Sequence, residues 1–266
     1  MTDDNAPQST LGPNGTLLAY HLYQPDMPSI PDVAVCFLGG YRSDMEGTKA
    51  LFLQDTCRNA KIPYLRFDYS GHGRSGGNFA DFTIGNWRDD ALHMVDTVLS
   101  GYRHIVLVGS SMGGWIMLLT ALARKDRIAG LVGIAAAPDF TTEMYHSVLN
   151  DAQRAELMET GLTHLPNPYS DEPYIITRAL IDDGERNNVL AGGIDFDGPV
   201  AIINGTADES VPADTAHKIY NAMKNKENTK VHIVDGGDHK LSRPQDLNLI
   251  RDCVFAVLNA AAGYEK

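Results

Sequence analysis

The sequence predicts a single α/β domain of residues 1–266, with a mostly parallel central sheet flanked by helices and a small helical lid insertion at residues 139–197. Short apolar runs are continuous rather than alternating, as expected for strands buried on both faces. Helix-like stretches separate these runs, and such alternation is typical of parallel α/β folds. A chain of 266 residues with 43% hydrophobic composition suffices for a sizeable core.

The expected strands and helices follow one another in a regular order. The strands are the apolar runs VAVCFLGG from Val33, PYLRFDYS from Pro63, HIVLVGS from His104, GLVGIAAA from Gly130 and PVAIINGT from Pro199. Helix-like stretches cover 47–61, 84–100, 112–124 and 212–225. A last helix begins at Pro244, where proline is tolerated, and its apolar residues recur at three- and four-residue steps. We expect this helix to pack on the sheet.

The segment 139–197 breaks the alternation because it contains no strong apolar strand. Its sequences TTEMYHSVLNDAQRAELMETG and SDEPYIITRALIDDG indicate polar, partly amphipathic helices joined by the Pro-rich HLPNPYS. We expect a lid above the carboxyl edge of the sheet. Some of its side chains either face an acyl chain or anchor the lid to the domain: Met144, Tyr145, Leu149, Leu157, Met158 and Tyr174.

Charge and composition exclude several classes of protein. The formal net charge of −12 and the absence of a basic cluster argue against nucleic acid or an anionic membrane as the main partner. No apolar run approaches the ~20 residues of a membrane span, and MTDDNAPQST lacks the features of a secretory or transit signal, so a cytoplasmic setting is expected. Cys36, Cys57 and Cys253 have no metal-ligand spacing and are expected to be reduced core thiols.

The stretch VGSSMGGW contains the candidate nucleophile. The spacing G-x-S-x-G fits only Gly109, Ser111 and Gly113, so Ser111 rather than Ser110 is the candidate. A buried strand precedes the motif and a helix follows it, as in a nucleophile elbow. The alternative is a glycine-rich turn with idle serines, so the assignment depends on finding partners for Ser111.

A serine hydroxyl needs an imidazole to accept its proton and a carboxylate to orient that imidazole. Asp208 follows the strand from Pro199 and is the predicted acid, with Glu209 as the neighbouring alternative. Among the nine histidines, His239 follows both Ser111 and the acid in a loop after a strand, so it is the predicted general base.

An oxyanion intermediate needs two N–H donors. Met112, next to the nucleophile, supplies the first, and the loop CFLGGYRSD after an early strand offers Tyr41 as the favoured second donor, with Gly40 as the alternative. The sequence GHGRSG also satisfies G-x-G-x-x-G, but no helix opens at it. We interpret it as a packed loop in which His72 is structural or lines the substrate site.

These motifs make the chain resemble the α/β-hydrolases, and more narrowly the branch that contains palmitoyl-protein thioesterases and acyl-glucuronide esterases. The resemblance covers nearly the whole chain from about Leu17, and it implies that Ser111, Asp208 and His239 form a catalytic triad that cleaves acyl thioesters or acyl glucuronides. It is carried by LGGYRSDMEGTKA from Leu38, RFDYSGHGRSGG from Arg66, WRDD from Trp87, LVGSSMGGWIMLLTALAR from Leu107, NGTADESVP from Asn204 and GGDHKLSRPQDL from Gly236.

The sequence therefore predicts a serine hydrolase acting on a small-molecule ester, an acyl thioester or an acylated protein, with no metal or organic cofactor. A carbon–carbon bond hydrolase of the same fold and a non-catalytic ligand-binding scaffold are the alternatives. A dehalogenase is disfavoured because it uses an aspartate where Ser111 stands.

Overall fold

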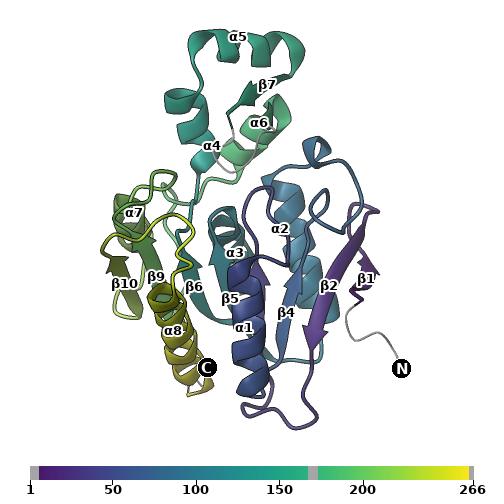
Figure 1. The fold of residues 1–266 in the computed structure, drawn as a ribbon, viewed down its shortest axis with the longest axis vertical. Helices are drawn as coiled ribbons and strands as arrows, with labels where there is room; N and C mark the ends of the chain where they lie inside the picture. Colours follow the sequence, from purple (N-terminus) through teal and green to yellow (C-terminus); the bar gives the residue numbers. More distant parts are fainter. Residues whose placement is uncertain (1–5, 167–172, 264–266) are drawn as a thin grey trace.

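The computed structural model describes residues 6–166 and 173–263 (Figure 1). At its centre is an eight-stranded sheet with the strand order β1-β2-β4-β3-β5-β6-β9-β10. The strands from β4 onward in this order run parallel, while β1 and β2 are antiparallel to their neighbours. The strands are β1 Gln8–Leu11, β2 Leu17–Tyr23, β3 Val33–Leu38, β4 Tyr64–Phe67, β5 His104–Ser110, β6 Ile128–Ile134, β9 Val200–Gly205 and β10 Thr229–Val234. The predicted mostly parallel α/β fold is confirmed.

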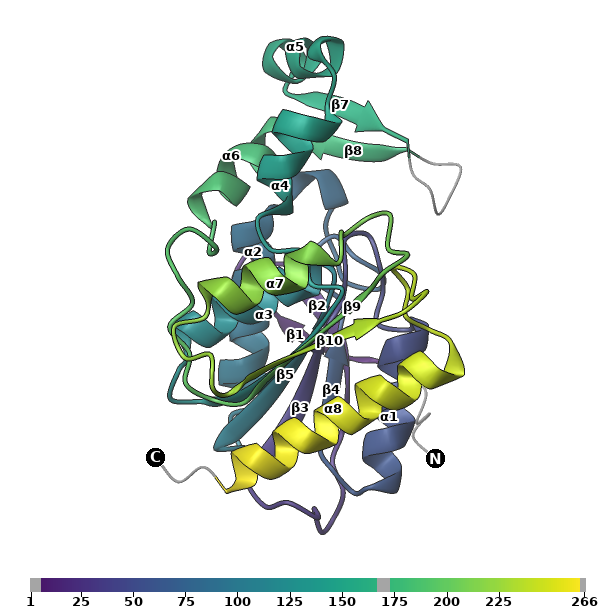
Figure 2. The same cartoon turned by 90° about the vertical axis from the view of Figure 1, so that its left-hand side faces the viewer.

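Helices cover both faces of this sheet (Figure 2). Residues of α1 and α8 pack on one face, and residues of α2, α3 and α7 pack on the other. The helices are α1 Thr48–Asn59, α2 Ile84–His93, α3 Met112–Ala123, α7 Asp214–Ala222 and α8 Pro244–Ala262. The stretch predicted as one helix over 84–100 instead continues beyond α2 as a π-helical turn, Met94–Val98.

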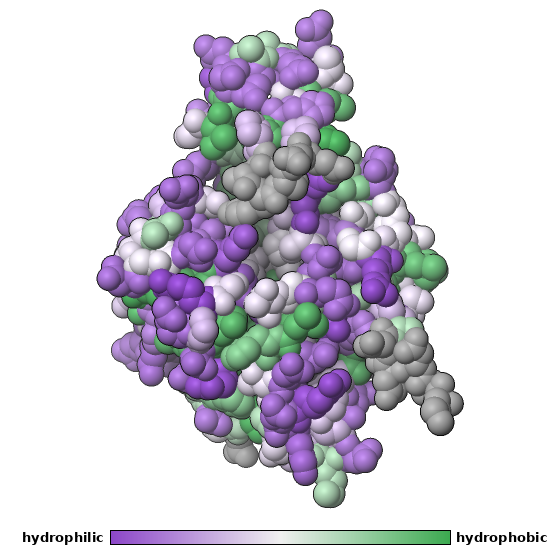
Figure 3. Space-filling model, viewed as in Figure 1, coloured by the Kyte–Doolittle hydropathy of each residue, from purple (hydrophilic) through white to green (hydrophobic). Residues whose placement is uncertain are grey.

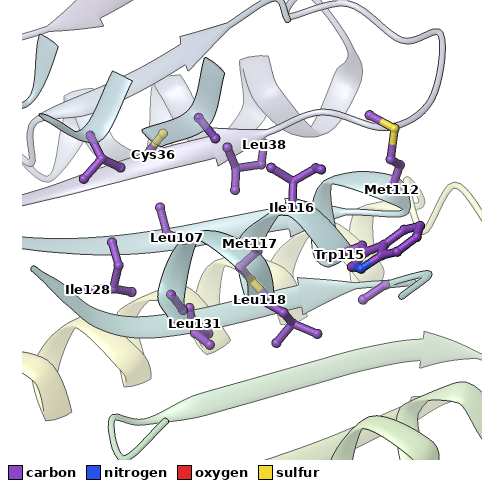
Figure 4. Packing of buried hydrophobic residues seen from close by; sticks show 14 of the residues in the cluster. Cys36, Leu38, Leu107, Met112, Trp115, Ile116, Met117, Leu118, Ile128 and Leu131 are labelled. Carbon is purple, nitrogen blue, oxygen red and sulfur yellow. The ribbon is translucent and has the colours of Figure 1, made fainter. Parts of the chain in front are cut away.

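The two-sided cover explains why the strand sequences are continuously apolar. Along β5, Leu107 points toward α3 while Val106 and Val108 join the cluster formed with α1 and α8, and all three side chains are fully buried. Figure 4 shows Leu107 beside the α3 residues Ile116 and Met117. A strand enclosed in this way has no solvent face on which polar residues would alternate.

The three cysteines lie in these clusters as free, buried thiols, as expected. Hydrophilic residues cover most of the face seen in Figure 3, in keeping with the acidic composition. None of the helices in residues 6–166 and 173–263 has the length and hydrophobicity of a membrane span.

The segment between β6 and β9 forms a separate layer that stands above one end of the sheet (Figure 1). It contains α4 Phe140–Glu143, a π-helical turn Met144–Val148, α5 Asp151–Thr160, β7 Leu162–Leu165, β8 Tyr174–Thr177 and α6 Arg178–Arg186. We call this segment the lid.

The lid contains helices as predicted, but the helix expected through Tyr174–Thr177 is wrong there, because β7 and β8 pair as an antiparallel ribbon. The β-branched residues Ile175, Ile176 and Thr177 favour a strand at a point where the sequence pattern predicts a helix. Ile176 and Leu165 turn into a small apolar cluster of the lid, and this burial stabilises the ribbon. The Pro-rich joint falls largely on residues 167–172, which lie outside the described residues, as do residues 1–5 of the N-terminal segment.

Candidate active site

Ser111 lies at the sharp turn between β5 and α3. Its backbone has φ 55° and ψ −122°, a region that costs a residue with a side chain about 1–3 kcal/mol. The turn is held by backbone bonds: the Ser111 N–H donates to the Ile134 carbonyl at 2.9 Å, and the Ser111 carbonyl accepts from Gly114 at 2.8 Å and Ala137 at 3.0 Å. This strained turn projects the hydroxyl from the carboxyl end of the sheet.

The glycines of the motif are explained by the close passage of α3 over β3 and β5. A Cβ atom added at Gly109 would overlap the carbonyl of Gly113, and one added at Gly113 would overlap the carbonyl of Leu38. Gly109 and Gly113 therefore leave the space in which the strand-to-helix turn closes.

His239 lies within hydrogen-bond distance of both Ser111 and Asp208. The Nε2 atom of His239 is 3.1 Å from the Ser111 Oγ, and its Nδ1 atom is 2.9 Å from Oδ2 of Asp208. With the proton on Nδ1, the imidazole donates a hydrogen bond to the Asp208 carboxylate and accepts one from the Ser111 hydroxyl at Nε2. The three predicted residues, remote in sequence, thus form one chain of hydrogen bonds.

The Asp208 carboxylate is fixed by its own loop. Its Oδ1 accepts the N–H groups of Ser210 and Val211, both at 2.8 Å, and its side chain is fully buried. Glu209, the alternative acid, is exposed. The carboxylate that orients His239 is therefore that of Asp208.

The loop after β3 packs directly on Ser111. A Cβ atom placed on Gly40 would lie 3.4 Å from the Cβ of Ser111. Met112 begins α3 on the other side of the nucleophile, where the first N–H groups of a helix have no partner within the helix. Among the described residues, neither the Met112 nor the Tyr41 N–H has a protein acceptor. Both groups are thus free to donate to an oxyanion.

Tyr41 also reaches the lid. Its hydroxyl donates to the Ile175 carbonyl of β8 at 3.1 Å, and its ring meets Phe140 and Tyr174 edge to face. The next residue, Arg42, donates from Nη1 to the Pro173 carbonyl at 3.0 Å. One short loop therefore touches both the nucleophile and the lid.

The G-x-G-x-x-G stretch is a packed loop, with no helix opening at it. Both oxygens of Asp68 accept backbone N–H groups, Oδ1 from Met45 at 2.6 Å and Oδ2 from Arg74 at 2.8 Å. His72 is buried, and burial lowers its pKa to about 4, so its neutral Nε2 accepts the Arg42 N–H at 3.3 Å. His72 thus holds the Gly40–Arg42 loop by a hydrogen bond, which is the structural one of its two predicted roles.

A cavity of about 210 Å³ opens beside the contact between His72 and Arg42. It is lined by Arg42, Ser43, Asp44, Gly71, His72, Gly73 and Phe79.

No group of three metal-ligating side chains placed to hold an ion occurs among residues 6–166 and 173–263.

The lid side chains divide into two kinds. Leu149 and Leu157 are buried in the apolar cluster of the lid, so they anchor it. Met144, Tyr145 and Tyr174 are half-buried against that cluster, and Met158 is 51% exposed. Contact with an acyl chain stays a prediction for these four residues.

Comparisons with known proteins find relatives in both sequence and fold. The model of the alpha/beta hydrolase family matches residues 39–248. Mouse palmitoyl-protein thioesterase ABHD10, mitochondrial, is 35% identical over 217 residues, which are 81% of this chain and 72% of that protein. A putative hydrolase from Agrobacterium vitis S4 has a TM-score of 0.87 at 41% identity, covering 94% of this chain and 97% of that one. Mouse alpha/beta hydrolase domain-containing protein 10 has a TM-score of 0.85 at 30% identity, covering 96% and 98%.

Proposed function

The chain belongs to the alpha/beta hydrolase family and is a hydrolase, and from that premise we propose that it cleaves carboxylic ester or thioester bonds with Ser111 as nucleophile. The observation that carries the proposal is the pair of contacts made by His239, at 3.1 Å to Ser111 Oγ and 2.9 Å to Asp208 Oδ2. A nucleophile, a base and an orienting acid in this order have the geometry that acyl transfer requires.

In the proposed first half of the reaction, the Ser111 oxygen attacks the acyl carbonyl while His239 Nε2 accepts the hydroxyl proton. The buried Asp208 carboxylate stabilises the imidazolium that forms. The negative charge on the carbonyl oxygen is held by the N–H groups of Met112 and Tyr41. Collapse of this intermediate breaks the bond to the leaving alcohol or thiol, which takes the proton from His239, and the acyl group stays on Ser111.

In the second half, water enters and His239 removes one of its protons as the oxygen attacks the acyl-enzyme. The same two N–H groups hold the second oxyanion. His239 then returns the proton to the Ser111 oxygen, and the carboxylic acid leaves. The reaction consumes one water and needs no redox step.

We propose an acyl thioester, on a protein or a small molecule, as the substrate class, with acyl glucuronides as a second ester class. The name of the mouse relative, a palmitoyl-protein thioesterase, supports this assignment. The ring of Tyr41 meets the lid rings of Phe140 and Tyr174, and together they supply apolar surface suited to an acyl chain. A cytoplasmic setting stays part of the proposal, whereas the relative's name assigns that protein to mitochondria.

The test is a panel of acyl-coenzyme A thioesters and 4-nitrophenyl esters of increasing acyl length, assayed with the wild-type protein and Ser111→Ala. We expect turnover that depends on acyl length and falls on the order of 10⁶-fold in the variant. If the protein cleaves a vinylogous 1,5-diketone and does not hydrolyse the esters, it is instead a carbon–carbon bond hydrolase. Ligand binding without turnover of any substrate would indicate a non-catalytic scaffold.

A further inference from the structure

Lys49 reaches the loop that carries His239. It is the second residue of α1, and its Nζ donates to the carbonyl of Lys240 at 2.6 Å, across 191 positions in the chain. Lys240 directly follows His239. The lysine therefore bonds to the backbone of the loop next to the candidate base, although it lies on a helix that the proposed mechanism does not use.

The loop from Gly236 to Leu241 has a strained and closely packed backbone. Leu241 is fully buried with φ 44°, and its N–H donates to Oδ1 of Asp238 at 2.9 Å. Gly237 packs against Gly205 so closely that neither position has room for a Cβ atom. A displacement of the loop by a fraction of an ångström would lengthen the contact between His239 and Ser111.

The surroundings of Lys49 combine burial with opposite charge. The half-buried ammonium is faced by Asp208 from the β9–α7 loop and by Asp238 and Lys240 from the β10–α8 loop. Burial lowers the pKa of Lys49 to about 8, while the two carboxylates act in the opposite direction and Lys240 adds to the lowering. The ammonium is thus a cation close to two carboxylates, one of which is the candidate acid of the site.

We propose that Lys49 is a positioning residue for His239, whose charged ammonium holds the Lys240 carbonyl and so fixes the loop against α1. The proposal rests on the proposed function of Ser111, His239 and Asp208. A charged donor makes a hydrogen bond roughly twice as strong as a neutral one, so loss of the proton weakens the hold without removing the side chain. The amine is charged below its pKa, so its hydrogen bond to the Lys240 carbonyl weakens as pH rises through about 8.

The test compares Lys49→Met, which keeps the apolar stem, with Lys49→Arg, which keeps the charge. Lys218→Met, at an exposed position on α7, controls for the change in net charge. For each protein, kcat/KM for 4-nitrophenyl acetate is measured from about pH 6 to pH 9.5, a range that spans the titration of a lysine with a lowered pKa. We expect kcat/KM of the methionine variant to be about tenfold lower than that of the wild type at pH 7. Its kcat/KM should then stay constant toward alkaline pH. The arginine variant should keep most of the activity and lack the alkaline fall of the wild type.

Hydrogen exchange of the peptide that contains Lys240 and Leu241 provides a readout that does not depend on activity. We expect faster exchange in Lys49→Met at pH 7, and wild-type exchange in Lys49→Arg and Lys218→Met. Wild-type kinetics and exchange in Lys49→Met would overturn the proposal, as would equal losses in both Lys49 variants with the alkaline fall retained. An inactive wild-type protein would refute the proposed function alone, because the exchange comparison would still decide the role of Lys49.

Discussion

The carboxylate of Asp208 bonds to His239 through one oxygen and to the backbone of its own loop through the other. Oδ2 lies 2.9 Å from His239 Nδ1, while Oδ1 accepts two backbone N–H groups. We predict that Asp208→Asn keeps the loop, because an amide oxygen can still accept both bonds. Its NH₂ group would then face His239 and select the wrong tautomer, so kcat should fall on the order of 10⁴-fold.

Glu209→Gln is the matched control for this prediction. Glu209 is the exposed neighbour in the same loop, so its amide should leave kcat close to the wild-type value. Ester hydrolysis of both variants at pH 7.5, together with their circular dichroism, measures the effect. Equal activity of the two variants would show that the Asp208–His239 bond has no catalytic role.

Gly113→Ala should destabilise the fold at the nucleophile turn. The added methyl group would overlap the carbonyl of Leu38, which belongs to a buried strand and cannot move away without shifting β3. Overpacking of this kind costs about 1–3 kcal/mol or more, and the shift would displace Ser111 as well. Thermal unfolding measures the loss of stability, and ester hydrolysis measures the loss of activity.

Gly101→Ala supplies the comparison, because a Cβ atom at Gly101 meets nothing within 4 Å. We expect its unfolding temperature to stay close to that of the wild type. If Gly113→Ala unfolds at the same temperature as Gly101→Ala, the explanation of the motif from close packing is wrong.

Asp90 should make stability depend on pH. Burial raises the pKa of this carboxyl to about 6, and its Oδ1 has no partner among the described residues, although Oδ2 accepts the Ser70 N–H at 2.8 Å. Between the ordinary pKa and the raised one the folded protein binds more protons than the unfolded chain, so stability falls as pH rises toward 6 and stays lower above it.

Asp90→Asn should therefore stabilise the protein above pH 6, by up to about 2 kcal/mol, with the gain disappearing near pH 4. Unfolding temperatures measured from pH 4 to pH 8 test this expectation. Asp89→Asn changes the same charge on the neighbouring, exposed side chain and should show no such trend. A constant difference between Asp90→Asn and the wild type across this range would contradict the account.

Tyr41→Phe should loosen the lid while sparing the nucleophile. The variant loses the 3.1 Å bond to the Ile175 carbonyl, which is worth about 1 kcal/mol, but keeps its backbone N–H and its ring. We expect faster limited proteolysis within residues 139–197 and a higher KM for long acyl chains, with kcat for a short ester unchanged. Tyr220→Phe on α7 is the control. A large loss of kcat for the short ester would show that the hydroxyl acts in the reaction itself.

The meeting of Ser111, Asp208 and His239 can be predicted from the sequence because each residue lies at or shortly after the carboxyl end of a predicted strand. Parallel strands end at the same edge of a sheet, and residues after their carboxyl ends converge there. Burial on both faces makes those strands recognisable as apolar runs. The strands β5, β9 and β10 lie where this reasoning puts them, which explains why remote loops meet.

Contacts between distant polar groups could not be predicted in the same way. The hydrogen bond from Lys49 Nζ to the Lys240 carbonyl joins a helix to a loop far along the chain. Nothing in the local sequence of either segment indicates this bond. The support of Arg42 by His72 likewise depends on how two loops pack. In the lid, Ile175 and Ile176 favour a strand, but the surrounding sequence pattern fits a helix, and only the pairing with β7 decides between the two.

Reaction with a fluorophosphonate probe, followed by mass spectrometry of the intact protein and of its peptides, tests whether Ser111 is an activated nucleophile. We expect a single adduct on Ser111, formed slowly in His239→Ala and absent in Ser111→Ala. A wild-type protein that forms no adduct, or an adduct that persists in Ser111→Ala, would contradict it.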